Sequence, residues 1–434
     1  MSFSDFASDP ARPTRRQVLA AGAGFALLPA PLRAGAPERT VVDVDGEAAL
    51  KAALAKAGPG TTLRLAPGVY PRVGFKGVRG AAGAPIVLTS ADPENPARIE
   101  RLRVSEGAFL GFERLVFDYS YASDHDYNFK AFSLTNVTDT VVTDCTFEGD
   151  TARGTGTSAD GYGWAFCLGL TRCQRTVVQR NLFHGFTTGL ICADCRHIQV
   201  LANRIHSMRV DGMNFSQTPD LRIEGNHISD FLTSPEDKGH RDMIQFWTMR
   251  TKRPTERVVI RRNLLNSGHG PWSQTIFFGN EEVDQKRAGR EMFYRDVLIE
   301  ENVIINAHIH GVRMTHAIGV TIRNNTLIRN RLSVGREKKP GLYVPTIWVN
   351  KRCENIEVLR NVAAEVPGAR REGGWDVRDN ALIQDRRRGV ANHYDALFVN
   401  AIEGDPDDLR NFFYRKGGAL DGAGLGASWL QPER

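Results

Sequence analysis

The middle of the chain carries polar and aromatic residues on a series of short segments, each at a fixed distance from a recurring asparagine. Aligned by that distance, they form two columns: Asp211, Asp242, Gln274 and His310 in one, and Asn214, Gln245, Arg313 and Trp348 in the other. Side chains alternate between the two faces of a strand. If Met213, Ile244 and Val312 point inward, the second column points outward. Polar groups in register on consecutive strands form a line of contacts about one sugar ring apart.

The first column and its flank hold groups that can transfer protons. Asp211 and Asp242 on neighbouring strands would lie close enough to share a proton or a cation. His240 precedes Asp242 by two residues and titrates near neutral pH, so it can serve as a base or an acid. Arg313, beside His310, suits the binding of a carboxylate. The alternative, an aspartate that caps a turn beside a histidine on a loop, stays open.

Aromatic and basic residues flank these columns. Trp247 and Trp348 can stack on sugar rings, or they pack on the protein surface. Arg250 follows the Asp242 strand and would attract an anionic chain. The acidic segment 280–284 is more typical of a solvated loop than of a calcium site. No metal ligand set is therefore predicted, no cofactor is required, and Ca²⁺ is the one ion left open.

An internal repeat indicates the elements that must position these residues. A hexapeptide with alternating apolar residues ends at Asn181, Asn203, Asn226, Asn263, Asn302, Asn325 and Asn361, and a degenerate copy ends at Asp144. Period-two alternation predicts a strand with one buried face. Copies 22 or 23 residues apart suit one coil of a parallel β-helix with three short strands. Intervals of 36–39 residues hold a coil plus an inserted loop, and such loops often crowd the binding face.

Each repeated asparagine is expected to lie in a turn, where it tolerates a left-handed φ and stacks on its copies in a structural role. Cys173 and Cys195 each precede a repeated asparagine by eight residues. They should therefore stack as well, as a disulfide or as buried thiols. Segment 46–56 predicts an amphipathic helix that covers the first coil. The last seventy residues lose the repeat and are expected to fold over the other end.

We therefore predict an all-β, single-domain, right-handed parallel β-helix with an N-terminal helical cap and an irregular C-terminal tail. The expected segments are a signal peptide over 1–36, the cap and first coils over 37–100, the coiled body with groove-forming loops over 101–365, and the capping tail over 366–434.

The first residues are typical of an export signal. Arg15 and Arg16 precede an apolar run over 18–28 and small residues at 34–36. A twin-arginine pair before a modest apolar run indicates the Tat pathway, and the run is too short to span a bilayer. We expect a periplasmic or secreted protein without a membrane anchor.

The net charge of the chain is +6, and four Arg and two Asp within residues 1–36 account for +2 of it. The remaining basic bias is mild and is compatible with a polyanionic partner. Lys and Arg are scattered along the chain, and no nucleic-acid-binding module is recognisable. We expect no nucleic-acid partner and a monomeric protein.

A resemblance to a known group rests on several segments. They are 240–248, 274–278 and 324–327, the block 63–70 with 83–88, and the tail segments 395–400 and 418–421. Together they resemble bacterial right-handed β-helix proteins of the polysaccharide lyase and mannuronan epimerase group, among them alginate lyase and chondroitinase B relatives. The resemblance implies this fold and activity on an acidic polysaccharide.

Pectin-degrading hydrolases offer a rival resemblance, in Asp211, Asp242, segment 268–270 and Arg313. Here Arg241 stands where the second of that family's paired acids belongs, and segment 268–270 falls several residues early for its strand. An inverting hydrolase needs two carboxylates with a water between them, so the missing acid disfavours hydrolysis.

The leading hypothesis is a polysaccharide lyase that abstracts the proton at C5 of a uronic acid. A uronan epimerase, a hydrolase of polygalacturonase type and a non-catalytic polysaccharide-binding envelope protein are the alternatives. We assign catalysis to His240, Asp242, Asp211, His310 and Arg313, and substrate binding to Asn214, Gln245, Trp247, Gln274, Trp348 and Arg250. Arg313 or Gln245 would neutralise the substrate carboxylate and His240 or His310 would move the proton, while the two aspartates orient these groups or hold a cation.

Overall fold

The computed structural model describes residues 40–237, 239–335, 343–369 and 373–432. The expected signal peptide over 1–36 lies outside the described residues. Among the described residues, no helix has the length and apolar character needed to cross a membrane.

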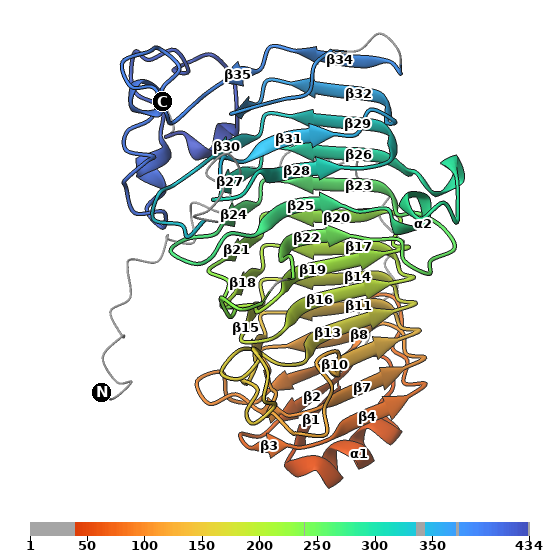
Figure 1. Ribbon diagram of the computed structural model, residues 1–434. Helices are drawn as coiled ribbons and strands as arrows, with labels where there is room; N and C mark the ends of the chain where they lie inside the picture. The colour runs from red at the N-terminus through yellow and green to blue at the C-terminus, as the bar shows by residue number, and fades with distance from the viewer. Residues whose placement is uncertain (1–39, 238, 336–342, 370–372, 433–434) are drawn as a thin grey trace. The chain divides into compact units, whose positions relative to one another are not determined.

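Three parallel sheets run along the coil, and each complete coil adds one strand to each sheet (Figure 1). Sheet A has 13 strands: β1 (Thr40–Val44), β2 (Thr61–Leu65), β5 (Ile86–Ser90), β8 (Leu110–Glu113), β11 (Thr138–Thr143), β14 (Gln174–Gln179), β17 (Arg196–Leu201), β20 (Leu221–Glu224), β23 (Glu256–Arg261), β26 (Tyr294–Glu300), β29 (Ala317–Arg323), β32 (Glu354–Leu359) and β34 (Trp375–Arg378).

Sheet B has 12 short strands: β3 (Val69–Tyr70), β6 (Arg98–Ile99), β9 (Val116–Asp118), β12 (Thr146–Glu148), β15 (Leu182–His184), β18 (Arg204–His206), β21 (His227–Ser229), β24 (Leu264–Asn266), β27 (Val303–Ile305), β30 (Thr326–Ile328), β33 (Val362–Ala363) and β35 (Ala381–Leu382). Sheet C has 10: β4 (Val73–Lys76), β7 (Leu102–Ser105), β10 (Lys130–Thr135), β13 (Phe166–Thr171), β16 (Thr188–Ala193), β19 (Asp211–Ser216), β22 (Asp242–Phe246), β25 (Gln274–Phe278), β28 (His310–Met314) and β31 (Thr346–Val349).

The predicted right-handed parallel β-helix is confirmed. One apolar core fills the interior of the coil, and its members alternate with outward residues along each strand, as in Val258 and Ile260 of β23. Phenylalanines from successive coils stack inside it, with Phe147 and Phe183 ring centroids 4.4 Å apart. Burial of these rings contributes hydrophobic stabilisation along the whole stack.

The repeated asparagines form a buried ladder between sheets A and B. Oδ1 of Asn203 accepts hydrogen bonds from the backbone N–H and Nδ2 of Asn181, both at 3.0 Å, and the pattern continues through Asn361 to Asn380. Each coil thus satisfies backbone groups of its neighbour.

The expectation that these asparagines adopt a left-handed φ is wrong. The left-handed residue is the one before each, with φ of +52 to +65° at Arg180, Ala202, Gly225, Arg262, Glu301, Asn324 and Arg360. The physical reason is that each amide must point inward to reach the next coil, so the chain bends one residue earlier. For the same reason Asp144, with φ +55°, corresponds to Arg180. Cys145 takes the ladder position, because its N–H donates to Asn181 Oδ1.

The two ends of the coil are covered differently. Helix α1 (Gly46–Lys56) buries Leu50 and Leu54 against the first coil, as predicted. At the other end the coil continues beyond residue 365 through β34 and β35. The tail, with α3 (Tyr394–Leu397), η3 (Leu409–Phe412) and η4 (Ser428–Leu430), packs its own apolar cluster against β27, β30 and β33 of sheet B (Figure 1).

All six cysteines are buried free thiols. Cys173 and Cys195 stack in adjacent coils as predicted, and the Cys173 N–H donates to Cys195 Sγ at 3.4 Å. Of the two forms left open, the structure has the thiol pair.

Candidate active site

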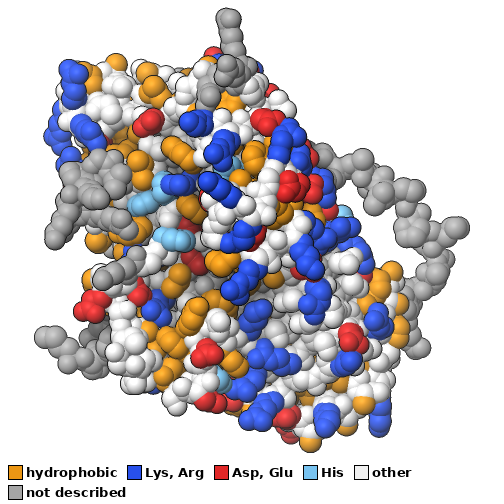
Figure 2. Space-filling view, turned by 45° about the vertical axis from the view of Figure 1, so that its right-hand side comes forward, with side chains coloured by type: hydrophobic (Ala, Val, Ile, Leu, Met, Phe, Trp, Pro, Cys, Tyr) orange, Lys and Arg blue, Asp and Glu red, His pale blue; other side chains and the backbone are white. Residues whose placement is uncertain are grey.

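Sheet C forms the floor of the candidate site, and the inserted loops border it. The long connections 149–165 and 230–241 lead from sheet B into sheet C, and 279–293 leads from sheet C into sheet A through α2 (Glu281–Asp284) and η1 (Arg290–Met292). In the space-filling view, histidine side chains lie close to lysine, arginine and hydrophobic side chains in the upper part of the face (Figure 2).

The strand register brings the predicted columns together. Asn214 pairs with Gln245, Gln245 with Phe277, Phe277 with Arg313 and Arg313 with Trp348. Met213, Ile244 and Val312 are fully buried, so the second column faces outward as expected. Phe277 is a member of this column that the sequence analysis missed, because it lies in the apolar run 276–278 where alternation gives no clear face.

His240 and Asp242 form a hydrogen-bonded pair at the start of β22. His240 Nδ1 lies 2.6 Å from Asp242 Oδ2, and Gln245 Nε2 donates to the same oxygen at 3.0 Å. The Asp242 side chain is fully buried, whereas the His240 side chain is 54% exposed. The hydrogen bond to Asp242 raises the pKa of His240. A carboxylate at Nδ1 requires the proton on Nδ1 in the neutral imidazole, so Nε2 carries the lone pair of this partly exposed ring.

Asp211 lies in the preceding coil and supports this pair from below. Its Oδ1 accepts the Asp242 backbone N–H at 3.0 Å, and its Oδ2 accepts from Asn214 Nδ2 at 3.0 Å. Burial, followed by the neighbouring Asp242 carboxylate, raises the pKa of Asp211 to about 7. The two aspartates are therefore neighbours, but a backbone hydrogen bond joins them, with no direct contact between the carboxyl groups.

The raised pKa of Asp211 makes the stability of the protein depend on pH. Asp211 stays protonated in the native state between its ordinary pKa of 3.8 and about 7. Its contribution to the free energy of unfolding is therefore complete below about pH 4 and is lost as the pH rises to about 7. Asp211→Asn cannot ionise and should remove this loss, about 1.4 kcal/mol for each pH unit in that window. Urea unfolding of both proteins at about pH 5 and about pH 8 measures the difference. If the free energy of unfolding changed by the same amount between the two pH values in both proteins, Asp211 would be ionised in the native state.

A second group lies two coils further along. Gln274 Oε1 lies 2.7 Å from His310 Nδ1, and Arg313 NH1 lies 2.8 Å from His310 Nε2. Because a guanidinium only donates, His310 Nε2 accepts and Nδ1 carries the proton. Burial, and then Arg313, lowers the pKa of His310 to about 4. His310 is thus uncharged at neutral pH, and its Nε2 lone pair accepts the hydrogen bond from Arg313. This contact positions Arg313.

Aromatic rings hold Arg313 on both sides. Its guanidinium carbon lies 4.6 Å from the Trp348 ring centroid and 5.4 Å from that of Phe277. The Phe277 ring centroid also lies 5.8 Å from that of His240, with an interplanar angle of 28°. Phe277 therefore joins the His240 group to the Arg313 group in one site.

Several buried polar atoms here have no hydrogen-bond partner among the described residues: Asp242 Oδ1, Asn214 Oδ1, Arg313 Nε and Thr188 Oγ1. Unpaired buried groups are costly, so a ligand in the groove would satisfy them. Ca²⁺ takes roughly six to eight oxygen ligands. The residues named here offer three such oxygens, from Asp242, Asn214 and Thr188.

Two predicted binding residues lie beyond the other end of β22 from the histidine–aspartate pair. Trp247 and Arg250 follow the end of β22, whereas His240 and Asp242 lie at its start. Arg250 lies in an exposed turn with φ +56°, and its backbone N–H donates to Glu282. Segment 280–284 is not a solvated loop, because it forms α2, where Glu282 is 8% exposed and ion-paired with Arg287.

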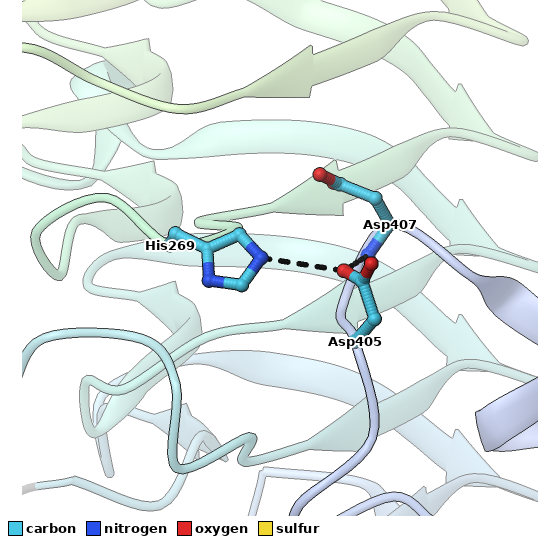
Figure 3. A group of neighbouring side chains, drawn as sticks. All are labelled: His269, Asp405 and Asp407. Carbon is cyan, nitrogen blue, oxygen red and sulfur yellow. Dashed lines mark hydrogen bonds and ion pairs between the residues drawn. The ribbon is translucent and has the colours of Figure 1, made fainter. Parts of the chain in front are cut away.

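His269, from the 268–270 segment, lies in a different place. One possible ligand atom from each of His269, Asp405 and Asp407 comes within 4.8 Å of the others, and all three residues are exposed (Figure 3). His269 Nε2 lies 3.3 Å from Asp405 Oδ1. His269 precedes β25 and pairs with the tail, so it does not join Asp211 and Asp242 as the hydrolase motif requires.

No family model matches the chain, and no curated protein matches it. Among solved structures, the Dettilon tailspike protein is similar at a TM-score of 0.51 and 12% identity, over 82% of this chain and 63% of that one. The alginate lyase from Paenibacillus sp. str. FPU-7 has a TM-score of 0.42 and 13% identity, over 68% of this chain and 94% of that one. The periplasmic alginate epimerase AlgG has a TM-score of 0.46 and 14% identity, over 80% and 73%.

At these identities the likeness shows the fold alone. The structural neighbours include alginate lyases, a pectate lyase and an alginate epimerase, the group that the sequence resembles. The chain is a parallel β-helix protein. The outer face of its sheet C carries a histidine–aspartate pair and an arginine that stacks on aromatic rings.

Proposed function

We propose that the protein is a polysaccharide lyase acting on a chain that contains uronic acid. The observation that carries the proposal is the His240–Asp242 pair, 2.6 Å apart, joined through Phe277 to an arginine that stacks on two aromatic rings of sheet C. The first group can move a proton and the second can bind a carboxylate, the two tasks that this elimination requires.

In the proposed reaction, Arg313 binds the uronate carboxylate, so that negative charge developing beside it is stabilised. His240 Nε2 removes the proton from C5, and the electron pair forms the C4–C5 double bond as the C4–O4 bond breaks. The protonated His240 returns its proton to the leaving O4 oxygen. Asp242 holds the imidazole and stabilises its charged form, as a buried carboxylate does in a catalytic triad.

Between the two histidines considered from the sequence, the contacts favour His240 as the base. His310 has its lone pair occupied by Arg313, and its pKa is lowered to about 4. His240 has a free Nε2 and a raised pKa, so its basic form becomes populated on the alkaline side of its ordinary range.

Replacing Arg313 by lysine should separate charge from geometry. Lysine keeps the positive charge but loses the planar fork and the stacking on Trp348 and Phe277. We expect kcat/KM to fall about 10- to 100-fold, mainly through KM, because a bidentate charged contact is replaced by a single point charge. Arg257→Lys, a change in an arginine paired with Asp220 on sheet A, is the control. An unchanged KM in Arg313→Lys would remove this arginine from carboxylate binding.

The direct test is the ultraviolet absorbance of the unsaturated product during incubation with alginate, glucuronan, pectate and glycosaminoglycans, each with and without calcium. A rise on one substrate that is lost in His240→Gln supports the lyase. New reducing ends without absorbance would indicate a hydrolase, and exchange of solvent hydrogen into C5 without cleavage would indicate an epimerase. Binding without any of these would leave a polysaccharide-binding protein.

We also propose export by the Tat pathway, on the pattern of Arg15, Arg16 and the apolar run 18–28. Replacing both arginines by lysine should keep the protein in the cytoplasm of an expressing bacterium. Fractionation and immunoblotting measure this, and unchanged export of the double variant would contradict it.

A further inference from the structure

A group of three cations lies on the same sheet as the candidate active site, in the earlier coils. Arg101 directly precedes β7, Arg103 lies within β7, and Lys130 begins β10. Among the described residues, no carboxylate forms an ion pair with any of the three. The lowered pKa of Arg103 is due to burial and to Arg101, and that of Lys130 to burial and to Arg103.

Several outward arginines elsewhere on the coil have acidic partners. On sheet A, Arg175 pairs with Asp139 at 2.6 Å and Arg257 with Asp220 at 2.5 Å. Unbalanced neighbouring cations repel one another, so the group on sheet C is suited to an anion that the chain itself does not supply.

The group is held in place by its surroundings. The guanidinium carbons of Arg101 and Arg103 lie 5.2 and 5.3 Å from the Phe129 ring centroid. His125 stacks on the same ring at 3.8 Å, and its Nε2 lies 2.9 Å from Arg101 NH2. Burial, and then Arg101, lowers the pKa of His125, so it acts as a neutral acceptor for the arginine. The arginines are thereby ordered before any ligand binds.

Lys130 extends along the sheet toward the active site. A Cβ on Gly169, in β13 of the next coil, would lie 2.8 Å from Lys130 Cδ and 3.5 Å from its Cε. The absence of a side chain at Gly169 therefore leaves the path that the lysine follows.

Strand pairing along sheet C relates the group to Asp211. The register runs from Lys130 to Phe166, Thr188 and Asp211 on successive strands. Strands lie about 4.8 Å apart, which places Lys130 and Asp211 about 14 Å apart along the coil. A cavity of about 390 Å³, lined by Phe166, Thr188 and Asp211 together with Trp164, lies along this path.

We propose that Arg101, Arg103 and Lys130 form a distal subsite that binds the carboxylate of a second uronic acid in the same chain. The inference rests on the proposed function for its substrate class. A subsite here requires that the substrate carries acidic groups at repeated positions. Chains too short to reach from Arg313 past Asp211 to Lys130 should then bind less tightly.

Direct binding tests the subsite without requiring turnover. Isothermal titration with short and long uronic-acid oligosaccharides is carried out on the full chain carrying Asp242→Asn, with and without Arg103→Gln/Lys130→Gln. We expect the double change to weaken binding of the long oligosaccharides roughly ten-fold or more, the effect of losing hydrogen bonds to a charged group. Binding of the short ones should not change.

Three further proteins and one ligand complete the test. Gly169→Ser, which displaces Lys130 without removing it, should weaken long-chain binding in the same direction. Arg103→Lys should retain most of it, and Arg175→Gln on sheet A should have no effect. Carboxyl-reduced chains of the same length should bind weakly and equally to all variants.

Equal losses for short and long chains, or no loss, would overturn the proposal. A loss that persists with carboxyl-reduced chains would overturn it as well. Length-dependent binding without any reaction in the wild-type protein would uphold the subsite while rejecting the proposed lyase activity, so the two failures are distinguishable.

Discussion

Replacing Asp242 by asparagine is expected to lower turnover of the uronic-acid substrate by roughly 100- to 10,000-fold, the usual contribution of a positioned proton-transfer group. Asp242 Oδ2 accepts from both His240 and Gln245. An asparagine of nearly the same shape would present an N–H to one of these donors or force the imidazole into the other tautomer. In that tautomer His240 Nε2 carries the proton and can no longer accept one from the substrate.

The measurement is the steady-state rate of product absorbance, with circular dichroism to show that the coil remains folded. Asp405→Asn is the matched control, because Asp405 also pairs with a histidine, His269, but in an exposed contact with the tail. His240→Gln should lose activity to a similar extent, and the double variant should lose little more, since the two residues act as a unit. Activity retained in Asp242→Asn would exclude the pair from catalysis.

Replacing Asn263 by alanine is expected to lower the free energy of unfolding by roughly 3–5 kcal/mol, because each buried polar group left unpaired costs about 1–3 kcal/mol. The Asn263 side chain is fully buried. Its Oδ1 accepts the backbone N–H and Nδ2 of Asn226, both at 3.0 Å, and its Nδ2 donates to the Ile223 carbonyl and to Asn302. Alanine leaves the buried Asn226 backbone N–H without its acceptor and removes one hydrogen bond from each of the other partners, although Asn226 Nδ2 keeps its bond to Val200 and Asn302 Oδ1 keeps the Asn263 backbone N–H.

Urea unfolding followed by circular dichroism measures this change. Asn392→Ala removes an exposed amide of the tail and serves as the control, with an expected change within about 0.5 kcal/mol. A comparably small change in Asn263→Ala would mean that water replaces the amide inside the ladder.

The sequence was most informative where the asparagine ladder runs. Because Asn226, Asn263 and Asn302 mark equivalent points of successive coils, counting from them gave the correct register of Asp242, Gln274 and the outward column. The same counting could not show that His240 Nδ1 meets Asp242 Oδ2, since this contact depends on how the loop 230–241 closes onto β22. Nor could it show that Arg313 occupies the His310 lone pair.

The cation group was not recognised in the sequence for a related reason. The coils before Cys145 lack ladder asparagines, so no fixed point related Arg103 and Lys130 to Asp211. Phe277 was missed because three apolar residues in a row hide the alternation. Trp247 and Arg250 are close to Asp242 in sequence, but the strand between them places them at its other end.

The regular coil keeps the spacing of the reactive groups independent of the loops that determine ligand preference. Strand pairing in the three sheets sets the coil spacing, and the asparagine amides link the coils at the corner between sheets A and B, whereas the long loops enter and leave sheet C. A loop can therefore lengthen or shorten without shifting the floor groups relative to one another. Ligand preference can diversify through the loops while the spacing of the reactive groups stays constant, and exchange of one loop is a route to a new specificity.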